Sequence, residues 1–519
     1  MTAIVSEEQD RDVIVIGGGI GGLVAATYLA YTKARVILFE AQSVLGGAAE
    51  TADIGKGYRA PIAAHTLHAL DPYSLRELNL VRHGLRFAER DMNLVALRPG
   101  GRHLVLPRNI WRGRSAIHAF APKEAKAYIR FKREILGFAR RLRPWWSSGA
   151  APGDEFREHS AAAIARRLGL SVSDGVKLDA FSRMSAASYL DRWFESDALK
   201  AALSFDAALD GLPPQEPGSA LLLVWRHAQE SCGRQAAVSQ PQGGPLGLVE
   251  ALTGAARAAG VEIRTEASVA SLVIKEGRAA GVHLRSGEIF AARAVLSSLD
   301  VRQTLLGLVP PGALGFGAAA NVVEGRVLAP AKLLLGLSGL PPFAGLGLHD
   351  LRGRIVLAER PESAAEAKGA ALDGRLPQEP VMEVTVPTIA DPHLAPPNGH
   401  VLSVLVPDMP ISPAEGWRSG RNTLRRRVLA GLETYAPGLK DRIVCELLLT
   451  PDESAPRNGA APPIARLLSS YASRIRTPVP GLFLCGSTAE PVDAISGRAG
   501  RIAASLASAE LQNTRGRAP

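Results

Sequence analysis

Cysteine is scarce in this chain of 519 residues, which has only Cys232, Cys445 and Cys485, far apart and never in a Cys-x-x-Cys pair. This spacing gives no support to a disulfide framework or to a thiolate zinc site, and it excludes dithiol redox chemistry. We therefore expect a reducing compartment and no metal centre. The first residues also lack the layout of a secretory signal or of a mitochondrial transit peptide, so we expect a cytoplasmic protein.

Uncharged runs are present, but neither of the two that stand out suits a bilayer. Residues 303–323 and 333–348 carry no charge, yet each run contains a Pro-Pro pair that breaks a membrane-spanning helix. We expect these runs to form a buried helix-turn-helix or the lining of a lipophilic pocket.

Positive charge is in excess, with a formal net charge of +10 and a pI near 9.7. Basic residues are spread along the chain, and we expect no nucleic-acid partner. A modest concentration lies in residues 130–146, where apolar residues recur at helical spacing and Trp145-Trp146 ends the segment. Such a basic amphipathic helix either lies on a membrane surface or packs its apolar face on the core, which is the commoner use.

A βαβ unit opens the chain, with an expected strand at residues 13–16, a helix at 20–31 and a strand at 35–39. Gly17-x-Gly19-x-x-Gly22 lies between the first strand and the helix, and Glu40 ends the second strand. This context is typical of a dinucleotide site, in which the glycines allow a tight turn and close approach to a pyrophosphate. Glu40 is expected to bind ribose hydroxyls. The motif alone leaves NAD and FAD open.

A second glycine pair, Gly46-Gly47, follows in EAQSVLGGAAET. Together with DVIVIGGGIGGLVAATYLA, this stretch resembles the signature of the FAD-binding phytoene desaturase and amine oxidase superfamily. The resemblance implies FAD as the cofactor, with the glycine pair approaching the pyrophosphate. The segment GGPLGLVEALTGAARAAGVEIRTEASVASLVIKEGRAAGVHL resembles the central part of that family, which implies that Val269 contacts the adenine.

The C-terminal PVPGLFLCGSTAEPVDAISGRAGRIAASLA resembles the second flavin motif of the family, which places backbone amides near the isoalloxazine. The chain departs from the motif where relatives have a glycine run, because it has Val492-Asp493-Ala494. Residues 450–476 also lack the family pattern. Asp493 either replaces backbone contacts and retunes the flavin, or the ring site has decayed; Gly486, Gly497 and Gly500 favour a working flavin.

The cofactor-binding residues that we expect from motif and resemblance together are Gly17, Gly19, Ile20, Gly21, Gly22, Glu40, Ala41, Gly46, Gly47, Ala48, Val269, Gly486, Ser487, Asp493, Ala494 and Ile495. No catalytic residue is assigned. His65 and His68 follow the second glycine pair and could manage a proton, but hydrogen bonding in the core is the alternative. Asp71 and Arg59 are weaker candidates still, and Trp193, Phe194 and Trp225 are expected to pack.

The branch of the superfamily that looks most similar contains bacterial phytoene dehydrogenase-related proteins and a mitochondrial pyridine nucleotide-disulfide oxidoreductase domain-containing protein. The resemblance implies a lipophilic, isoprenoid or carotenoid-like substrate that loses a hydride to FAD. No second dinucleotide motif is present, so dioxygen or a quinone is the expected electron acceptor. An amine substrate has little support from the 5% of aromatic residues. The alternative class is an FAD-binding interaction protein with little or no turnover.

The fold class that we expect is α/β, with a discontinuous Rossmann-like FAD-binding domain and a second α+β substrate-binding domain. The FAD-binding domain is expected at 1–120, 241–300 and 481–519, a mainly helical substrate-domain insertion at 121–240, and a substrate domain with an antiparallel sheet at 301–480. Oligomeric state is left open, and peripheral contact with the cytoplasmic membrane is a further expectation.

Overall fold

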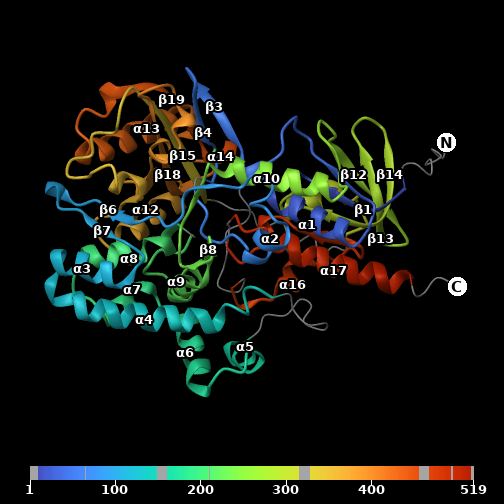
Figure 1. Ribbon diagram of the computed structural model, residues 1–519, viewed down its shortest axis with the longest axis horizontal. Helices are drawn as coiled ribbons and strands as arrows, with labels where there is room; N and C mark the ends of the chain where they lie inside the picture. Colours follow the sequence, from blue (N-terminus) through green and yellow to red (C-terminus); the bar gives the residue numbers. More distant parts are fainter. Residues whose placement is uncertain are drawn as a thin grey trace.

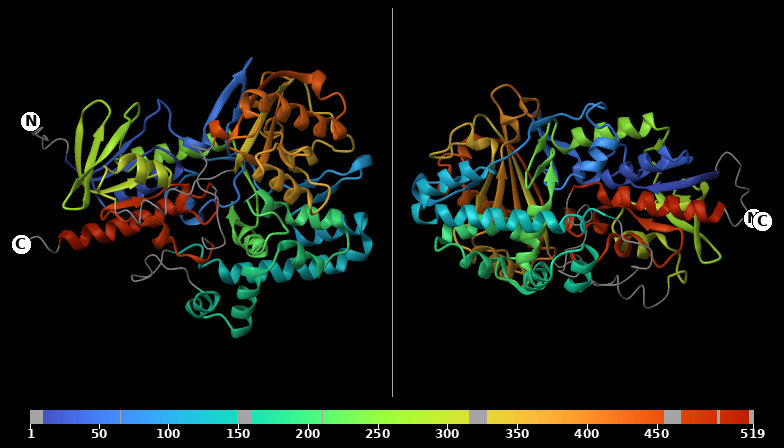
Figure 2. Two further views of the ribbon diagram at one scale, coloured as in Figure 1. Left: turned by 180° about the vertical axis from the view of Figure 1, so that it is seen from behind. Right: turned by 60° about the horizontal axis from the view of Figure 1, so that its bottom comes forward.

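The structure is a computed structural model that describes residues 10–64, 66–148, 160–209, 211–314, 328–454, 467–492 and 495–515. Two large sheets form its frame. The first sheet, with β1 and β12 to β14, lies at one end of the molecule, and the second, with β15 and β18, lies at the other (Figure 1). A layer of helices lies along the second sheet, as the turned views confirm (Figure 2).

The first sheet has seven strands, and its parallel part runs in the order β11-β2-β1-β14-β20. The strands of this part are β1 (Asp10–Ile16), β2 (Val36–Phe39), β11 (Glu262–Arg264), β14 (Ile289–Ser297) and β20 (Leu482–Leu484). The antiparallel strands β12 (Val269–Lys275) and β13 (Arg278–Leu284) extend it from β14. Segments from the beginning, middle and end of the chain thus share one sheet, as the predicted discontinuous α/β fold requires.

Both faces of the first sheet are covered, which explains why β1 is apolar at every position from Val13 to Ile16. Val13 and Val15 pack toward the helices α1 (Ile20–Tyr31), α10 (Pro245–Ala258) and α17 (Arg498–Arg515). Ile14 and Ile16 pack on the other face, against the β12-β13-β14 meander.

The second sheet also has seven strands, in the order β19-β15-β18-β17-β16-β6-β7. Its strands are β6 (Leu94–Ala96), β7 (Leu104–Leu106), β15 (Leu328–Leu337), β16 (Arg354–Leu357), β17 (Met382–Thr385), β18 (His400–Pro410) and β19 (Ile443–Leu449). Neighbouring strands are antiparallel except β16 and β6. Residues 328–449 thus contribute a largely antiparallel sheet, in which β17 and β18 are neighbours.

One face of the second sheet is covered by α13 (Gly416–Tyr435), and the other faces the helical layer. That layer consists of α3 (Ile110–Phe120), α4 (Ala125–Leu142), α5 (Ala161–Arg167), α6 (Val172–Arg183), α7 (Ala186–Asp191), α8 (Asp197–Leu209) and α9 (Ser219–Ala228). Ser160, Ser171 and Ser185 each start one of these helices by accepting the N–H three residues on. The serine caps therefore mark the starts of helices that also contribute buried side chains to the core.

Smaller elements connect these layers. The hairpin of β3 (Thr51–Gly55) and β4 (Tyr58–Pro61) packs on β15, and short pairs form between β5 (Phe87–Glu89) and β10 (Gln240–Pro241) and between β8 (Glu230–Ser231) and β9 (Arg234–Gln235). The remaining helices are α2 (Pro72–Glu77), α12 (Ser363–Leu372), α14 (Pro451–Ser454) and α16 (Tyr471–Ile475).

Two details of the sequence-based layout need correction. The uncharged run 333–348 does not form a helix-turn-helix: residues 333–337 belong to strand β15 in the interior of the second sheet, where a strand covered on both faces is as apolar as a buried helix, and turns and bends follow. Residues 94–106 were expected in the first domain, but β6 and β7 pair with the second sheet through β16. Of the other run, Gln303–Leu308 forms a π-helical turn, and residues 315–323 lie outside the described residues.

The basic helix α4 packs its apolar face on the core, so the commoner alternative is the observed one. Trp145 and Trp146 are 6% and 2% exposed, and both indole N–H groups donate to the carbonyl of Leu467. Arg141 and Arg143 pair with Asp174 and Glu230. Helix α4 therefore gives no support to membrane contact. Among the described residues, no helix has both the length and the apolar character needed to cross a bilayer.

Candidate functional site

The turn after β1 is built on glycines that leave no room for a side chain. Gly17 has a φ of +90°, and its N–H donates to the carbonyl of Phe39 over 2.7 Å. A Cβ on Gly22 would lie 2.1 Å from the carbonyl oxygen of Gly17. The turn can therefore close onto the start of α1 only with glycine at these places.

Gly21 serves a second kind of close packing. A Cβ on Gly21 would lie 2.0 Å from the carbonyl oxygen of Cys485, and a Cβ on Gly500 would lie 2.3 Å from the carbonyl oxygen of Gly21. Helices α1 and α17 consequently approach each other and β20 through their backbones. This contact joins the N-terminal motif to the C-terminal one.

Gly19 and Gly47, in contrast, are not crowded, because an added Cβ would meet its neighbours at ordinary van der Waals distance. The nearest atom to a Cβ on Gly19 is the Ser298 Oγ at 3.8 Å, and the nearest to a Cβ on Gly47 is the Gly19 Cα at 3.7 Å. The two glycine turns are held together by the Gly46 N–H, which donates to the carbonyl of Gly18 over 3.0 Å. Gly19 caps α1 without a side-chain hydrogen bond. The first N–H groups of α1 and the bare turns thus fit a pyrophosphate, which is the test that a dinucleotide cofactor has to meet here.

Glu40 lies at the end of β2 beside these turns. Its Oε2 accepts the Gly18 N–H over 2.7 Å, and its Oε1 accepts the Gln42 N–H over 2.9 Å. Both contacts fix the carboxylate, and each oxygen retains a lone pair for a further donor. Glu40 is therefore held where ribose hydroxyls can donate to it.

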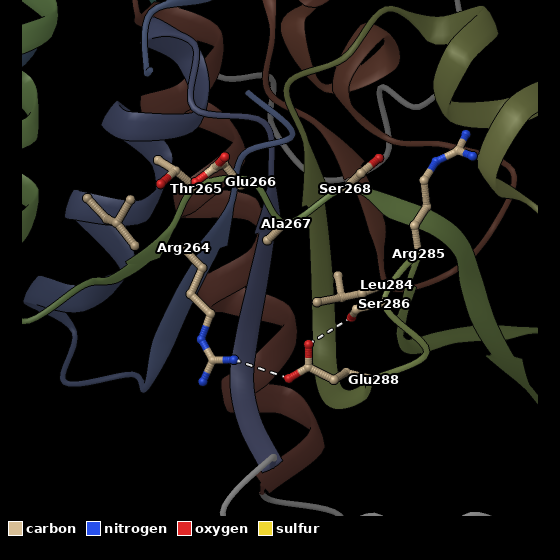
Figure 3. A pocket seen from close by; sticks show the side chains of 10 residues that line it. Arg264, Thr265, Glu266, Ala267, Ser268, Leu284, Arg285, Ser286 and Glu288 are labelled. Atoms are coloured by element: carbon tan, nitrogen blue, oxygen red, sulfur yellow. Dashed lines mark hydrogen bonds and ion pairs between the residues drawn. The ribbon is translucent and has the colours of Figure 1, made fainter. Parts of the chain in front are cut away.

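A cavity of about 480 Å³ adjoins Glu40, between the segment that follows β11 and the turn from β13 to β14 (Figure 3). The Ala267 N–H in its wall donates to the backbone carbonyl of Glu40 over 2.8 Å. Across the cavity mouth, Arg264 lies 3.5 Å from the Glu288 carboxylate. Val269, the expected adenine contact, begins β12 directly after this wall. Its role stays a prediction.

The C-terminal motif starts from β20 with an equally close backbone contact. A Cβ on Gly486 would lie 2.2 Å from the carbonyl oxygen of Ser298. Glu490 is 3% exposed; it accepts the Tyr471 hydroxyl over 2.5 Å and the Ala499 N–H over 2.8 Å. Glu490 thereby fixes the first turn of α17. Asp493 and Ala494, on which the ring environment was expected to depend, lie outside the described residues.

Lys332 also lies in this region, although the sequence did not single it out. Its Nζ donates to the carbonyls of Pro61 and Ala63 over 2.6 Å and 2.7 Å. The next residue, Ala64, donates its N–H to the carbonyl of Ala48, which follows Gly47. Lys332 is therefore linked to the glycine cradle by a short series of backbone contacts. Burial lowers the pKa of its ammonium to about 7. A single lysine inside an apolar strand was the available signal.

The other residues that the sequence suggested for catalysis or packing have different surroundings. His65 lies outside the described residues, and Arg59 is in β4. His68 has a buried Nε2 without a hydrogen-bond partner among the described residues, and burial lowers the pKa of its ring well below the usual value. Asp71 is structural, since it caps α2 and pairs with Arg501. Trp225 and Phe194 are buried as predicted.

A family model for an NAD(P)-binding Rossmann-like domain matches residues 15–78. The mouse pyridine nucleotide-disulfide oxidoreductase domain-containing protein 2 is 30% identical, over 98% of this chain and 94% of that protein. The lycopene-forming phytoene desaturase of Pseudescherichia vulneris is 27% identical, over 97% of this chain and 100% of that protein. This chain belongs to the oxidoreductase superfamily of phytoene desaturases and amine oxidases. The structure of a putrescine oxidase variant shows the same fold, with a TM-score of 0.61. It is 18% identical and covers 98% of this chain and 99% of that chain.

Membership confirms the resemblance that the glycine motifs indicated, and the geometry explains it. At Gly21, Gly22 and Gly500 of the signature stretches, an added Cβ would clash with a backbone oxygen. At Gly19 and Gly47 an added Cβ would meet no such clash, so these turns can accept a ligand. The expected cofactor contacts of individual residues stay predictions.

Proposed function

We propose that this chain is an FAD-dependent dehydrogenase or desaturase that oxidises a lipophilic molecule, of isoprenoid or carotenoid type, and passes the electrons to dioxygen or a quinone. The observation that carries the proposal is the pair of uncrowded glycine turns at Gly19 and Gly47, with Glu40 fixed beside them. Relatives named as phytoene desaturases support the reaction type.

Bound FAD supplies the two-electron acceptor for a substrate C–H bond. In the proposed reaction one C–H bond breaks as hydride and the neighbouring C–H bond loses a proton. A C=C bond forms, and the two electrons finally reduce dioxygen to hydrogen peroxide or a quinone to its quinol. The chain itself has to place an apolar substrate, exclude water and accept one proton.

Lys332 is the residue placed to hold that proton. An amine whose pKa is about 7 is neutral in about half of the molecules at neutral pH and can act as a base. Apolar side chains surround it, with Leu334 and Val401 fully buried beside the β3-β4 hairpin. This wall excludes water from the Nζ atom and explains the lowered pKa.

The second candidate is an FAD-binding interaction protein with little or no turnover, because Val492-Asp493-Ala494 replaces the expected glycine run. The two candidate functions differ in whether an added lipid reduces the bound flavin. A working enzyme bleaches the flavin absorbance when an oxidisable lipid is added without oxygen, whereas a scaffold binds flavin that no lipid reduces.

The test is the visible spectrum of the purified protein, followed by chromatography of the released cofactor to distinguish FAD from FMN. A colourless protein that also fails to bind added FAD would overturn the proposal. Anaerobic addition of a panel of isoprenoid, carotenoid and amine donors then identifies the substrate class by the rate of bleaching. Reoxidation by air or by a soluble quinone identifies the acceptor.

A further inference from the structure

A cavity of about 90 Å³ lies between the helical layer and the second sheet, and its wall combines two kinds of side chain. One water needs roughly 10–15 Å³ of such volume, so the cavity has room for several waters or a small polar group. The apolar part of the wall contains Met92, Leu94, Leu106, Pro107, Ala202, Leu203 and Val238. The polar part contains His68, Arg108, Lys132, Asp206, Arg226, His227 and Arg354. Structural burial alone rarely collects so many ionisable groups.

Lys132 is the central group of the polar part. It is 8% exposed on α4, and its Nζ lies 3.0 Å from the His227 Nε2. The His227 Nδ1 lies 2.9 Å from the carbonyl of Leu223, which can only accept, so Nδ1 carries the proton and Nε2 accepts from Lys132. Burial and Lys132 lower the pKa of His227 to about 3, so this imidazole is neutral.

Among the described charged groups of the cavity wall, one cation has no carboxylate partner. Arg354 pairs with both Glu383 and Asp206, Arg226 lies 3.6 Å from Asp206, and Arg108 pairs with Asp91. Asp91 also lies 3.6 Å from Arg234, which is half exposed. Lys132 is the cation without a carboxylate within ion-pair distance among the described residues. A singly charged anion would complete the cluster, and the unpartnered Nε2 of His68 provides a further hydrogen-bonding atom.

The cavity and Lys332 lie over the same face of the second sheet. Lys332 pairs with Leu405, and Leu405 pairs with Glu383 on the next strand. Directly paired residues of antiparallel strands point to one face, so the Lys332 and Glu383 side chains share it. Two strand spacings of about 4.8 Å separate them, and Arg354 on β16 lies one spacing further. An extended molecule of about 10–15 Å would connect the two places.

We propose that this cavity receives the carboxylate end of an amphiphilic substrate, with Lys132 as its counter-charge and the apolar chain directed along the sheet toward Lys332. The inference rests on the proposed function and narrows its substrate class from plain hydrocarbons to lipophilic carboxylic acids. A carboxylate fits better than a phosphate dianion, because one cation of the described cavity wall lacks a carboxylate partner and the space is small.

The experiment uses the purified full-length protein with its flavin and three probes of equal chain length: dodecanoate, dodecanol and dodecyl phosphate. Binding is followed by the perturbation of flavin absorbance and, independently, by tryptophan fluorescence, since Trp225 packs edge-on to His68 with ring centroids 6.1 Å apart. We expect dodecanoate to bind at least tenfold more tightly than dodecanol at pH 7, and more tightly than dodecyl phosphate.

The preference should depend on pH through Lys132. Burial, with Arg108 adding to it and Asp206 opposing it, lowers the pKa of Lys132 to about 8. The neighbouring charged groups are the paired Asp206, Arg226 and Arg354, while His68 and His227 are neutral. Dodecanoate affinity should therefore fall above pH 8, and dodecanol affinity should not.

Lys132→Met should remove the preference for dodecanoate and leave dodecanol binding in place, and Lys132→Arg should restore part of it. Lys126→Met, on the exposed side of the same helix, is the matched control and should keep the wild-type preference. Equal binding of dodecanoate and dodecanol by the wild type would overturn the inference, as would a preference that survives in Lys132→Met. A protein that contains no flavin contradicts the proposed function instead, and fluorescence titration still tests the carboxylate site.

Discussion

The carboxylate of Asp71 is joined to the guanidinium of Arg501, 430 residues further along the chain, by a hydrogen bond of 2.7 Å from Nε. Asp71 is fully buried, and it also accepts the N–H and the hydroxyl of Ser74 at the start of α2. Arg498 lies 3.5 Å away on the same final helix. One side chain thereby ties the segment after the glycine cradle to the C-terminal helix, so these two parts of the cofactor-binding region hold each other in place.

Asp71→Asn should therefore cost stability rather than act on chemistry. The variant leaves the buried guanidinium of Arg498 and the partly buried guanidinium of Arg501 without their carboxylate, a loss of about 3–5 kcal/mol in the free energy of unfolding. Arg498 and Arg501 hold the pKa of Asp71 below its usual value although burial opposes them. The contribution is thus complete above about pH 4 and is lost as pH falls further. Urea unfolding at pH 7 and pH 3 measures both effects. Asp373→Asn, at an exposed pair with Arg375, is the control and should show little change.

The glycines of the cradle should divide into two classes when changed to alanine. Gly22→Ala places a Cβ 2.1 Å from a backbone oxygen and should prevent folding or abolish soluble expression. Gly19→Ala adds a Cβ whose nearest neighbour is the Ser298 Oγ at 3.8 Å, an ordinary contact, so the variant should fold and unfold as the wild type does but bind FAD at least tenfold more weakly. Thermal unfolding and FAD titration of the apoprotein measure the two effects separately.

Gly369→Ala is the control for the glycine series, because no atom lies within 4 Å of the added Cβ in α12. Alanine should stabilise this helix slightly. Full FAD affinity in Gly19→Ala would contradict the placement of the pyrophosphate at this turn.

Glu40→Gln should weaken FAD binding without loss of fold. Both carboxylate oxygens accept backbone N–H groups, from Gly18 and Gln42, and an amide can offer an acceptor to only one of them. The other N–H then faces an NH₂ group, and one acceptor for the ribose is lost. We expect about a tenfold to hundredfold rise in the dissociation constant of FAD, or about 1.4–3 kcal/mol. Glu276→Gln, in the exposed turn between β12 and β13, should leave the affinity unchanged.

The sequence predicted the parts of the fold that local rules decide. The βαβ unit depends on apolar periodicity and a glycine turn, and it is observed as β1, α1 and β2. What could not be predicted depends on contacts between distant segments. In the sequence, Lys332 is an isolated lysine in an apolar run, and Lys132 resembles a surface charge on a basic helix. In the structure, elements from elsewhere in the chain bury both side chains. A helix-turn-helix stayed one of two alternatives for residues 333–348, because periodicity does not distinguish a covered strand from a buried helix.

Lys332 provides the strongest test of the proposed chemistry, because its titration can be measured in two independent ways. Between about pH 7, the pKa of the folded state, and about 10.5 in the unfolded chain, the unfolded state binds more protons. The contribution of this lysine to stability should therefore rise with pH across that window. The difference in the free energy of unfolding between wild type and Lys332→Met should change by about 1.4 kcal/mol per pH unit there.

The same titration should govern the reaction. If the neutral amine accepts the substrate proton, the rate of anaerobic flavin bleaching rises with pH to a plateau above about 7, and Lys332→Met loses about 10²- to 10⁴-fold of it. Lys332→Met should nevertheless retain bound FAD, which separates proton transfer from cofactor loss. Lys126→Met, on the exposed side of α4, controls for removal of a lysine. A stability difference that follows pH while the bleaching rate does not would show that Lys332 is buried beside the cofactor region without acting as the base.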